Sequence, residues 1–384
     1  MNRVRRRLQS SLAGLMLGAG ALLPLPAATL TLTSPLEYQV IQRERPDTGY
    51  VELRGVLTGG EAKDSTLEWR IATNGKPGEW LTLPATLAGE SFTARVEARA
   101  GGWHRLQVRA VSRGEPLAEA AVEQVGVGEV FVVAGQSNAA NHGEERQSTE
   151  TGRVVTFDGK RWQLCCDPQP GASGHGGSFL PPFGDAMARR FGVPVGFIAC
   201  GIGATSVREW LPKGVKFPNP PTLTSRVQQL ADGQWESDGE AFDRLVSRTR
   251  QFGPRGFRAV LWHQGESDAN QKDPTRTLPG KLYGEYLETI IRESRRSIGW
   301  EAPWFVAQVS YHVPGDEASP DIRAAQASLW TDGVALPGPD TDAIKGSLRE
   351  KGGKGVHFSG PGLRAHAAAW VDKVAPWLEK QVAR

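Results

Sequence analysis

The hydrophobic pattern of the chain changes near residue 128, and this change constrains the fold more than any other feature of the sequence. Before it, short segments rich in Val, Leu and Thr recur between turn residues, and 103–108 alternates apolar and polar residues. After it, 130–134 is a continuous apolar run, which is typical of a strand buried on both faces. The sequence therefore predicts an all-β region followed by a region of a different class.

Residues 29–127 are expected to form a β-sandwich that resembles an immunoglobulin or fibronectin module. Turn segments such as 73–78 and 101–102 separate the expected strands. These strands are 29–32, 50–53, 66–71, 92–96 and 103–108. No cluster of catalytic residue types stands out here, so a structural or spacer role is favoured over sugar binding.

Residues 128–384 alternate buried strands with helical segments, which predicts a parallel sheet of the α/β class. The expected strands are 130–134, 194–199, 259–262 and 304–309, and the expected helices are 183–190, 282–291, 320–330 and 362–383. In open parallel sheets, ligands bind at the carboxyl ends of the strands. Polar residues that directly follow these strands are therefore the first candidates for a functional site.

The first 28 residues have the organisation of a secretory signal peptide. Four arginines between positions 3 and 7 form a basic start, 11–23 is apolar and uncharged, and 26–28 offers small residues for cleavage. The apolar run is too short, and too interrupted by glycine, to be a good membrane span. An uncleaved anchor or a lipoprotein is the alternative, although no cysteine follows the apolar run. The mature protein is expected to be secreted or periplasmic.

The net charge gives no reason to expect nucleic acid or a membrane as a partner. The signal segment carries four of the 45 basic residues and none of the 42 acidic ones, so the mature chain has a net charge close to −1. A near-neutral chain has no electrostatic attraction to a polyanion or an anionic bilayer. We therefore expect no nucleic acid partner and, after signal cleavage, no membrane partner.

The chain has three cysteines: Cys165, Cys166 and Cys200. In an exported protein, one disulfide can form between Cys200 and one of the adjacent pair, leaving one thiol. Three buried thiols are the alternative. The spacing is not that of a metal site, and no H-E-x-x-H motif occurs, so neither a metal nor another cofactor is expected.

Ser137 follows the first strand of the α/β region in Gly135-Gln136-Ser137-Asn138. A serine that comes after a glycine turn, at the carboxyl end of a buried strand, is well placed as a nucleophile. The pattern is not the G-x-S-x-G elbow, and a helix-capping serine is the alternative. After the second strand, the glycine turn around Gly203 can point a backbone N–H into the site, as an oxyanion hole requires.

Two further segments bring polar side chains to the same edge of the predicted sheet. Gln264 and Glu266 follow the third strand, where the amide could bind an oxyanion and the carboxylate could orient a histidine. Alternatively, both cap the next helix. His357 lies in a loop before the last helix and can reach Ser137 across the strand ends. His142 and His312 lie on loops near the site and are reserve candidates for the base.

Taken together, these four segments resemble the SGNH hydrolase superfamily, and more closely its sialate O-acetylesterase-like and acetylxylan-esterase-like branch. The family motifs G-Q-S-N, G-G-T-S-I-x-x-W, W-x-Q-G-E-S and D-G-x-H-F correspond here to 135–138, 203–210, 262–267 and 354–358. They occur in the family's order across 128–384. The resemblance implies a three-layer α/β/α domain and ester hydrolysis, and it is much less specific for the substrate.

The resemblance assigns the nucleophile to Ser137 and the general base to His357. The backbone N–H groups of Ser137 and Gly203, together with the Gln264 side chain, would bind the oxyanion. Such a hole stabilises the tetrahedral intermediate by about 3 kcal/mol for each donor.

One position departs from the family pattern. The family often has Asp three residues before the histidine, but this chain has Lys354, whose ammonium cannot accept the imidazole N–H. Glu266 is the first candidate to orient His357, and a backbone carbonyl in a Ser–His dyad is the second. Loss of the orienting carboxylate from such a triad lowers the rate by roughly four orders of magnitude.

The resemblance implies that the protein removes O-acetyl groups from a carbohydrate, either sialic acid or a plant or bacterial polysaccharide. Asn138, Trp210, Trp262 and His263 are candidates to contact the sugar, although the two tryptophans suit a hydrophobic core equally well. The alternatives are a catalytically impaired relative that binds carbohydrate, and an esterase that acts on a non-sugar ester.

Overall fold

A computed structural model describes residues 27–59 and 65–383 of the chain. The expected signal peptide, 1–28, lies outside the described residues except for its last two positions. No helix in the described part is long and apolar enough to cross a membrane.

The N-terminal region is built of two β-sheets that enclose one hydrophobic cluster. The first sheet has the order β1 (Thr29–Ser34), β3 (Thr48–Thr58), β8 (Ser91–Arg99) and β7 (Thr86–Ala88). The second contains β4 (Thr66–Thr73), β5 (Lys76–Pro77), β6 (Leu81–Thr82), β9 (Gly101–Ser112) and the first half of β10 (Glu115–Gly135). Leu53 and Phe92 of the first sheet and Leu106 of the second are almost completely buried in this cluster. The expected strands are present. The resemblance of this region to an immunoglobulin or fibronectin module remains a prediction.

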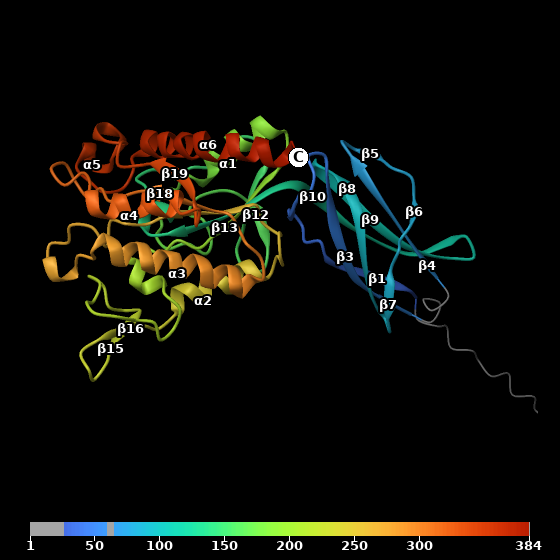
Figure 1. Cartoon of the computed structure of the whole chain (residues 1–384). Coiled ribbons are helices and arrows are strands. Elements are labelled where there is room, and N and C mark those ends of the chain that lie inside the picture. Colours follow the sequence, from blue (N-terminus) through green and yellow to red (C-terminus); the bar gives the residue numbers. More distant parts are fainter. Residues whose placement is uncertain (1–26, 60–64, 384) are drawn as a thin grey trace, which may run out of the picture.

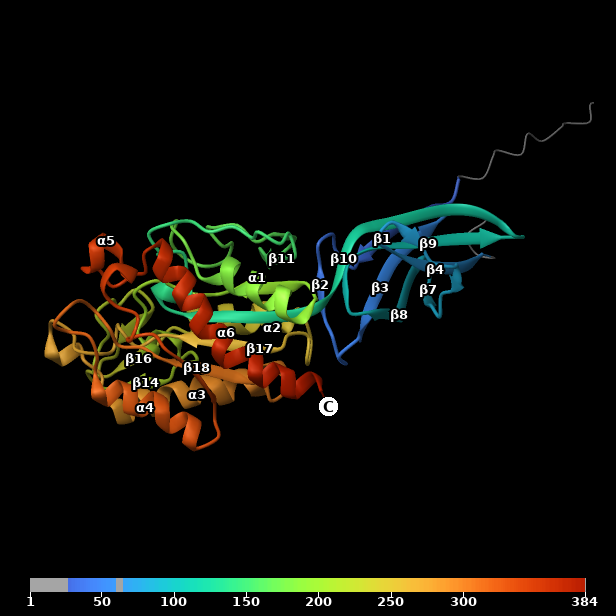
Figure 2. The same cartoon turned by 90° about the horizontal axis from the view of Figure 1, so that it is seen from above.

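Strand β10 runs without interruption from the N-terminal region into the α/β region, as Figure 2 shows. Its first half pairs with β9, its middle pairs with β2 (Val40–Gln42), and its second half lies between two strands of the α/β sheet. The boundary expected between 127 and 128 therefore falls inside one strand. Because the chain has no linker at this point, backbone hydrogen bonds couple the two regions directly.

The α/β region has a largely parallel sheet with β10 at its centre. The strand order is β12 (Trp162–Leu164), β11 (Val154–Phe157), β13 (Val195–Ala199), β10, β17 (Ala259–His263), β18 (Trp304–Gln308) and β19 (Leu336–Asp340). All neighbouring pairs are parallel except β11 with β12. The expected α/β class and the four expected strands are confirmed.

Helices cover both faces of this sheet and make three layers (Figure 1). Phe131 and Val133 of β10 pack in one core with α1 (Leu180–Phe191) and α6 (Gly360–Val382). The intervening Val130 and Val132 pack in a second core on the opposite face. That core contains side chains of α2 (Glu240–Arg250), α3 (Gly280–Ile298) and α4 (Pro320–Thr331). Because successive side chains of a strand point to opposite faces, one continuous apolar run supplies both cores.

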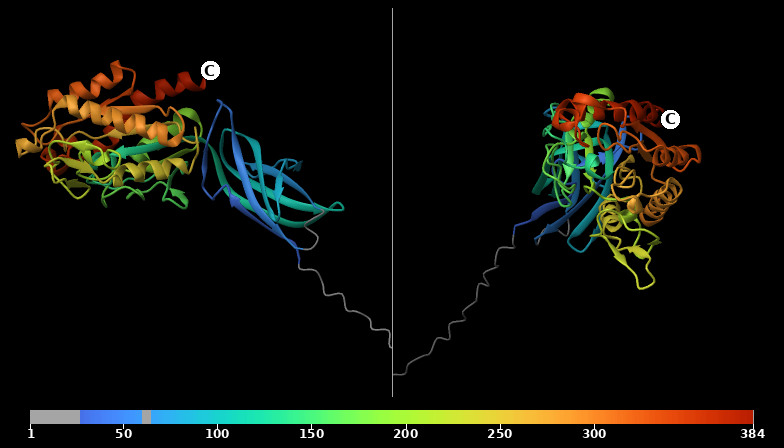
Figure 3. Two further views of the ribbon diagram at one scale, coloured as in Figure 1. Left: turned by 60° about the horizontal axis from the view of Figure 1, so that its bottom comes forward. Right: turned by 90° about the vertical axis from the view of Figure 1, so that its left-hand side faces the viewer.

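A small antiparallel sheet lies beside these layers, and Figure 3 shows it projecting from them. It consists of β14 (Lys216–Phe217), β16 (Trp235–Ser237) and β15 (Val227–Gln229). The short helical turns are η2 (Ser137–Ala139), η3 (Val207–Trp210), η4 (Pro274–Arg276), η5 (Gly346–Leu348) and α5 (Glu350–Gly353).

The three cysteines are free in the structure. Cys165 and Cys200 are buried, whereas Cys166 is exposed. Neither sequence-based alternative is therefore correct, because no disulfide forms and only two of the three thiols are buried. Burial raises the pKa of the Cys200 thiol to about 11, so this thiol stays protonated and packs as an apolar group.

Candidate active site

Ser137 lies just past the carboxyl end of β10, where the chain turns sharply. Gly135 has a φ of +126°, and a Cβ there would stand 2.0 Å from the backbone oxygen of His263 in the neighbouring strand. Only glycine fits so close an approach. Gln136 N donates to that same oxygen over 2.9 Å, and the turn η2 then begins with Ser137. Ser137 is 5% exposed and lines a cavity of about 870 Å³.

His357 lines the same cavity from the loop that precedes α6, and its Nδ1 lies 3.0 Å from Oε1 of Glu350. A tight turn makes this contact possible. Lys351 and Gly352 have left-handed backbone conformations, and Glu350 N donates to the His357 backbone oxygen over 2.9 Å. With Nδ1 facing a carboxylate, Nε2 is the ring nitrogen left to exchange a proton with a substrate.

The charge state of His357 suits a general base. Burial lowers its pKa below the usual 6.5, and the nearby Glu350 carboxylate acts in the opposite direction. The imidazole is therefore neutral at pH 7 and can accept a proton. No hydrogen bond joins Ser137 to His357 among the residues described. Such contacts are often long in unliganded enzymes and tighten when substrate binds.

Glu266 does not contact His357, so the expectation that it orients this ring has to be corrected. Its carboxyl group is turned toward the nucleophile segment, where Oε1 accepts a hydrogen bond from Asn138 Nδ2 over 3.0 Å. Asn138 Nδ2 also lies 3.3 Å from the Val356 backbone oxygen. Glu266 is 3% exposed, and burial raises its pKa to about 7. The carboxylate that faces the imidazole comes instead from Glu350, in the histidine's own loop.

Gln264 is also placed differently from the expectation. It is fully buried and does not line the cavity, so its amide is not positioned to bind an oxyanion. Its Nε2 donates to Oδ2 of Asp268 over 2.6 Å and to the Thr205 backbone oxygen over 3.1 Å. Asp268 also accepts hydrogen bonds from Ser206 Oγ and Val207 N, which tie the loops after β13 and β17 together. This buried carboxylate holds the Gln264 amide away from the cavity.

Gly203 does line the cavity, but its N–H already has a partner. It donates to Ser173 Oγ over 2.6 Å, and this hydroxyl lies 3.2 Å from Nε2 of His142. The His142 and His357 rings lie side by side with centroids 5.4 Å apart. A Cβ on Gly203 would stand 2.6 Å from His142 Nε2, so the ring covers this glycine closely. Ser173 is therefore part of the site, although no motif in the sequence marks it.

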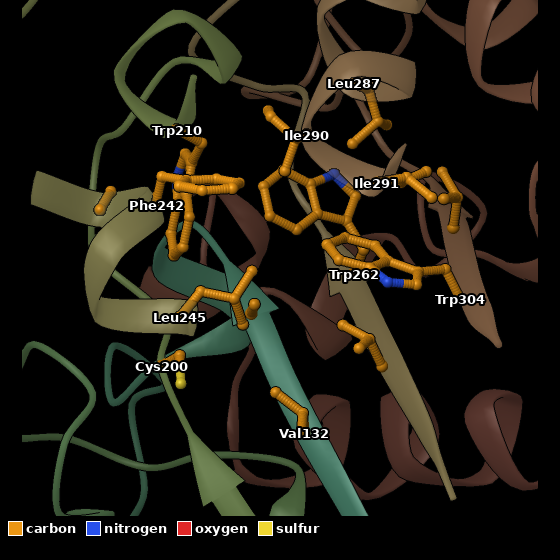
Figure 4. Close-up of a cluster of buried hydrophobic side chains, with 14 of the residues drawn as sticks. Val132, Cys200, Trp210, Phe242, Leu245, Trp262, Leu287, Ile290, Ile291 and Trp304 are labelled. Carbon is orange, nitrogen blue, oxygen red and sulfur yellow. The ribbon is translucent and has the colours of Figure 1, made fainter. Parts of the chain in front are cut away.

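The four residues expected to contact a sugar lie behind the cavity wall. Trp210 and Trp262 are fully buried and pack edge to face, with centroids 5.2 Å apart, beside side chains of α2 and α3 (Figure 4). His263 is fully buried, with Nε2 3.0 Å from Thr341 Oγ1. Asn138 is 4% exposed and links the loops as described above. None of the four lines the cavity.

The two reserve histidines both line the cavity, but they differ in their contacts. His312 is held on both sides, with Nδ1 2.6 Å from Asp316 Oδ2 and Nε2 2.6 Å from the Glu266 backbone oxygen. Among the described residues, His142 has the Ser173 hydroxyl as its one side-chain hydrogen-bond partner. Lys354, which replaces the usual aspartate, lies exposed at the cavity rim.

The site therefore has a serine and a neutral, carboxylate-paired histidine in one cavity, which is an arrangement for acyl transfer. In the part of the chain that the structure describes, no group of three or more His, Cys, Asp or Glu side chains could hold a metal ion. Sequence reasoning missed two members of the site, Ser173 and Glu350. The available signal for Glu350 was an acidic residue directly before the glycine-rich turn 351–355.

Comparisons with known proteins agree with this chemistry. The sequence profile of a family described as "carbohydrate esterase, sialic acid-specific acetylesterase" matches residues 127–364, which contain all four motif segments. The crystal structure of a carbohydrate acetylesterase from Xanthomonas citri is similar, with a TM-score of 0.50 and 18% sequence identity over 90% of this chain and 76% of that one. At this identity, the likeness demonstrates a shared fold only.

Two other comparisons add nothing to the assignment. A β-glucuronidase from Bacteroides uniformis has a TM-score of 0.27 and 9% identity over 74% of this chain and 33% of its own, which is too low to support an inference. No curated protein sequence matches this chain.

Proposed function

The chain belongs to the carbohydrate esterase family of sialic acid-specific acetylesterases, and on this basis we propose that it is a serine esterase that removes O-acetyl groups from a carbohydrate. Ser137 is the nucleophile, His357 is the general base, and Glu350 orients the imidazole. The single observation that carries the proposal is the 3.0 Å contact between Glu350 and His357 beside a cavity that Ser137 also lines.

The reaction proceeds in two steps of acyl transfer. His357 Nε2 takes the hydroxyl proton as Ser137 Oγ attacks the acetyl carbonyl, and the carbonyl π electrons move to oxygen. The tetrahedral intermediate collapses, the sugar oxygen leaves with the proton from the imidazolium, and the acetyl group stays on Ser137. Water then attacks this ester while His357 takes its proton, and the second tetrahedral intermediate collapses. The bond to Ser137 Oγ breaks, Oγ takes the proton from the imidazolium, and acetic acid is released. Glu350 stabilises the transient imidazolium in both steps.

The position of Glu350 supports an active enzyme over an impaired binding protein. In the sequence, impaired catalysis is suggested by Lys354, because it stands where the family often has the aspartate that orients the histidine. In the structure, Glu350 supplies a carboxylate to Nδ1, so the lysine does not leave the ring unsupported. The cavity volume of about 870 Å³ lies within the range of small-molecule sites.

We extend the proposal to two finer points. The acetylated sugar is sialic acid or a residue of a plant or bacterial polysaccharide, and the mature enzyme acts outside the cytoplasm after cleavage of the N-terminal signal. The first point is supported by the family match and the second by the basic, apolar and small-residue pattern of 1–28.

The test is acetate release by the purified mature protein from O-acetylated sialic acid and acetylated xylo-oligosaccharide, beside an aryl acetate and an aryl laurate. Wild type should hydrolyse an acetylated sugar and the aryl acetate but not the laurate, and Ser137→Ala should be inactive. Equal rates of Ser137→Ala and wild type would refute the mechanism. Turnover of aryl esters alone would favour a non-sugar ester as the substrate.

A further inference from the structure

The oxyanion of the proposed reaction needs hydrogen-bond donors. One expected donor does not face the cavity, and another already donates to a protein group. The Gln264 amide donates to Asp268 inside the protein, and Gly203 N–H donates to Ser173 Oγ. An esterase site typically places more than one donor on the developing charge. A group that lines the cavity must therefore supply the hydrogen bond that Gln264 does not.

The hydrogen-bonding capacity of Ser173 identifies this group. A serine hydroxyl has two acceptor positions and one proton to donate. Gly203 N–H fills one acceptor position over 2.6 Å, and His142 Nε2 is the second neighbour at 3.2 Å. Burial, as the largest influence, lowers the pKa of His142, so its ring is neutral at pH 7 and can carry its single proton on Nε2. In the tautomer with the His142 proton on Nε2, both neighbours donate, and the Ser173 proton remains for an acceptor in the cavity.

We propose that Ser173 is an additional catalytic residue whose hydroxyl donates a hydrogen bond to the tetrahedral oxyanion, in the place that the motif assigns to Gln264. This inference rests on the proposed esterase function. Gly203 N–H acts through Ser173, because a hydroxyl that accepts a short hydrogen bond becomes a stronger donor. His142 holds the hydroxyl from the other side and keeps its proton directed into the cavity.

The placement of the three groups supports this role. Ser173, Gly203 and His142 all line the cavity that contains Ser137 and His357. The bond between Ser173 and Gly203 joins the loop before α1 to the loop after β13, so the hydroxyl is fixed by two separate segments. Donors that are fixed before the reaction begins cost no reorganisation as charge develops on the oxygen.

The experiment compares Ser173→Ala with wild type, using an aryl acetate and methylboronic acid. The boronate forms a tetrahedral adduct with a serine hydroxyl and carries the same methyl group as an acetyl ester, so its affinity reports on transition-state binding. Loss of one oxyanion donor should lower kcat by about 10²–10³-fold, leave KM within about threefold, and weaken methylboronate binding by a similar factor to kcat/KM. Ser173→Thr, which keeps the hydroxyl, should recover most of the rate.

Ser267→Ala is the matched control, because Ser267 also lines the cavity and its hydroxyl makes no hydrogen bond among the described residues. This variant should behave like wild type. An unchanged kcat and boronate affinity in Ser173→Ala would overturn the inference while leaving the esterase proposal intact. A higher kcat would overturn it too, because Ser173 would then block Gly203. Failure of wild type both to hydrolyse the ester and to bind the boronate would refute the proposed function and this role with it.

Discussion

Oε1 of Glu350 lies 3.0 Å from Nδ1 of His357, and the two residues belong to one loop that folds back on itself. Arg349, which is almost fully buried, holds the loop by donating to the backbone oxygens of Ile344 and Val356 over 2.6 and 2.7 Å. The base and its carboxylate therefore form a local unit. Ser137 is more than 200 residues earlier in the chain, and the tertiary fold brings it to the same cavity as this unit.

The first prediction concerns the pH dependence of catalysis. The proposed base must be neutral, and burial lowers the pKa of His357 while Glu350 raises it. The acid limb of kcat/KM in wild type should therefore lie below pH 6.5. In Glu350→Gln the raising influence disappears, so the limb should move to a still lower pH. A pH profile of aryl acetate hydrolysis checks this, and a limb that moves upward would contradict it.

The second prediction concerns Glu266 and the pH dependence of stability. Burial raises the folded-state pKa of this carboxyl from 4.5 to about 7, so the folded protein binds a proton that the unfolded chain releases between these values. Stability is therefore lost as pH rises from about 4.5 to about 7, by roughly 3 kcal/mol at 1.36 kcal/mol per pKa unit. Glu266→Gln carries no such charge, so its stability relative to wild type should increase with pH in this window and level off above it.

Urea unfolding of the two proteins from pH 5 to pH 8 measures this difference. Glu285→Gln, at a half-exposed position on α3, is the control and should follow wild type. A stability difference between Glu266→Gln and wild type that stays constant across this range would show that Glu266 does not titrate there.

The third prediction concerns the junction between the two regions. Glu129 is completely buried in the middle of β10, where Oε1 lies 2.6 Å from Arg43 Nε and Oε2 lies 2.6 Å from Arg258 Nε. Arg43 follows β2 and Arg258 precedes β17, so one carboxylate binds cations from both regions. Removing a member of a buried charge network costs about 3–5 kcal/mol. Glu129→Ala should therefore lower the free energy of unfolding by about this amount.

Glu52→Ala is the matched control for this change. Its carboxylate pairs with Arg54 at the surface, where both side chains are 60% exposed. An exposed pair of this kind contributes about 1 kcal/mol or less. Equal losses of stability in the two variants, measured by urea unfolding, would contradict the role assigned to Glu129.

The fold could be predicted from the sequence where hydrophobic patterns are strong. Apolar runs such as 130–134 and 259–262 identified the central strands, and the helix at 282–291 followed from its spacing of apolar residues. Helix α2, strand β11 and the edge strands β12 and β19 were not predicted. Strand β19 contains Pro337 and Pro339, which disfavour strand structure and are tolerated here at the sheet edge.

The site was only partly predictable because motifs identify residue types and not side-chain directions. Ser137, Gly203 and His357 reach one cavity because parallel strands bring their following loops to a common edge. The direction of Gln264 depends on the buried carboxylate of Asp268, and that of Glu266 on Asn138. The contact between Glu350 and His357 depends on left-handed backbone conformations in the turn between them. The spacing of hydrophobic residues does not indicate such conformations.

The most direct test of the account compares Glu350→Gln with Glu266→Gln in aryl acetate hydrolysis at neutral pH, because both carboxylates line the cavity and only one faces His357. Glu350→Gln should lower kcat/KM by about 10³–10⁴-fold, as expected when a histidine loses its orienting carboxylate. Glu266→Gln should stay within about tenfold of wild type, because its amide oxygen can still accept from Asn138. The opposite result, with Glu266→Gln nearly inactive and Glu350→Gln close to wild type, would contradict the catalytic assignment.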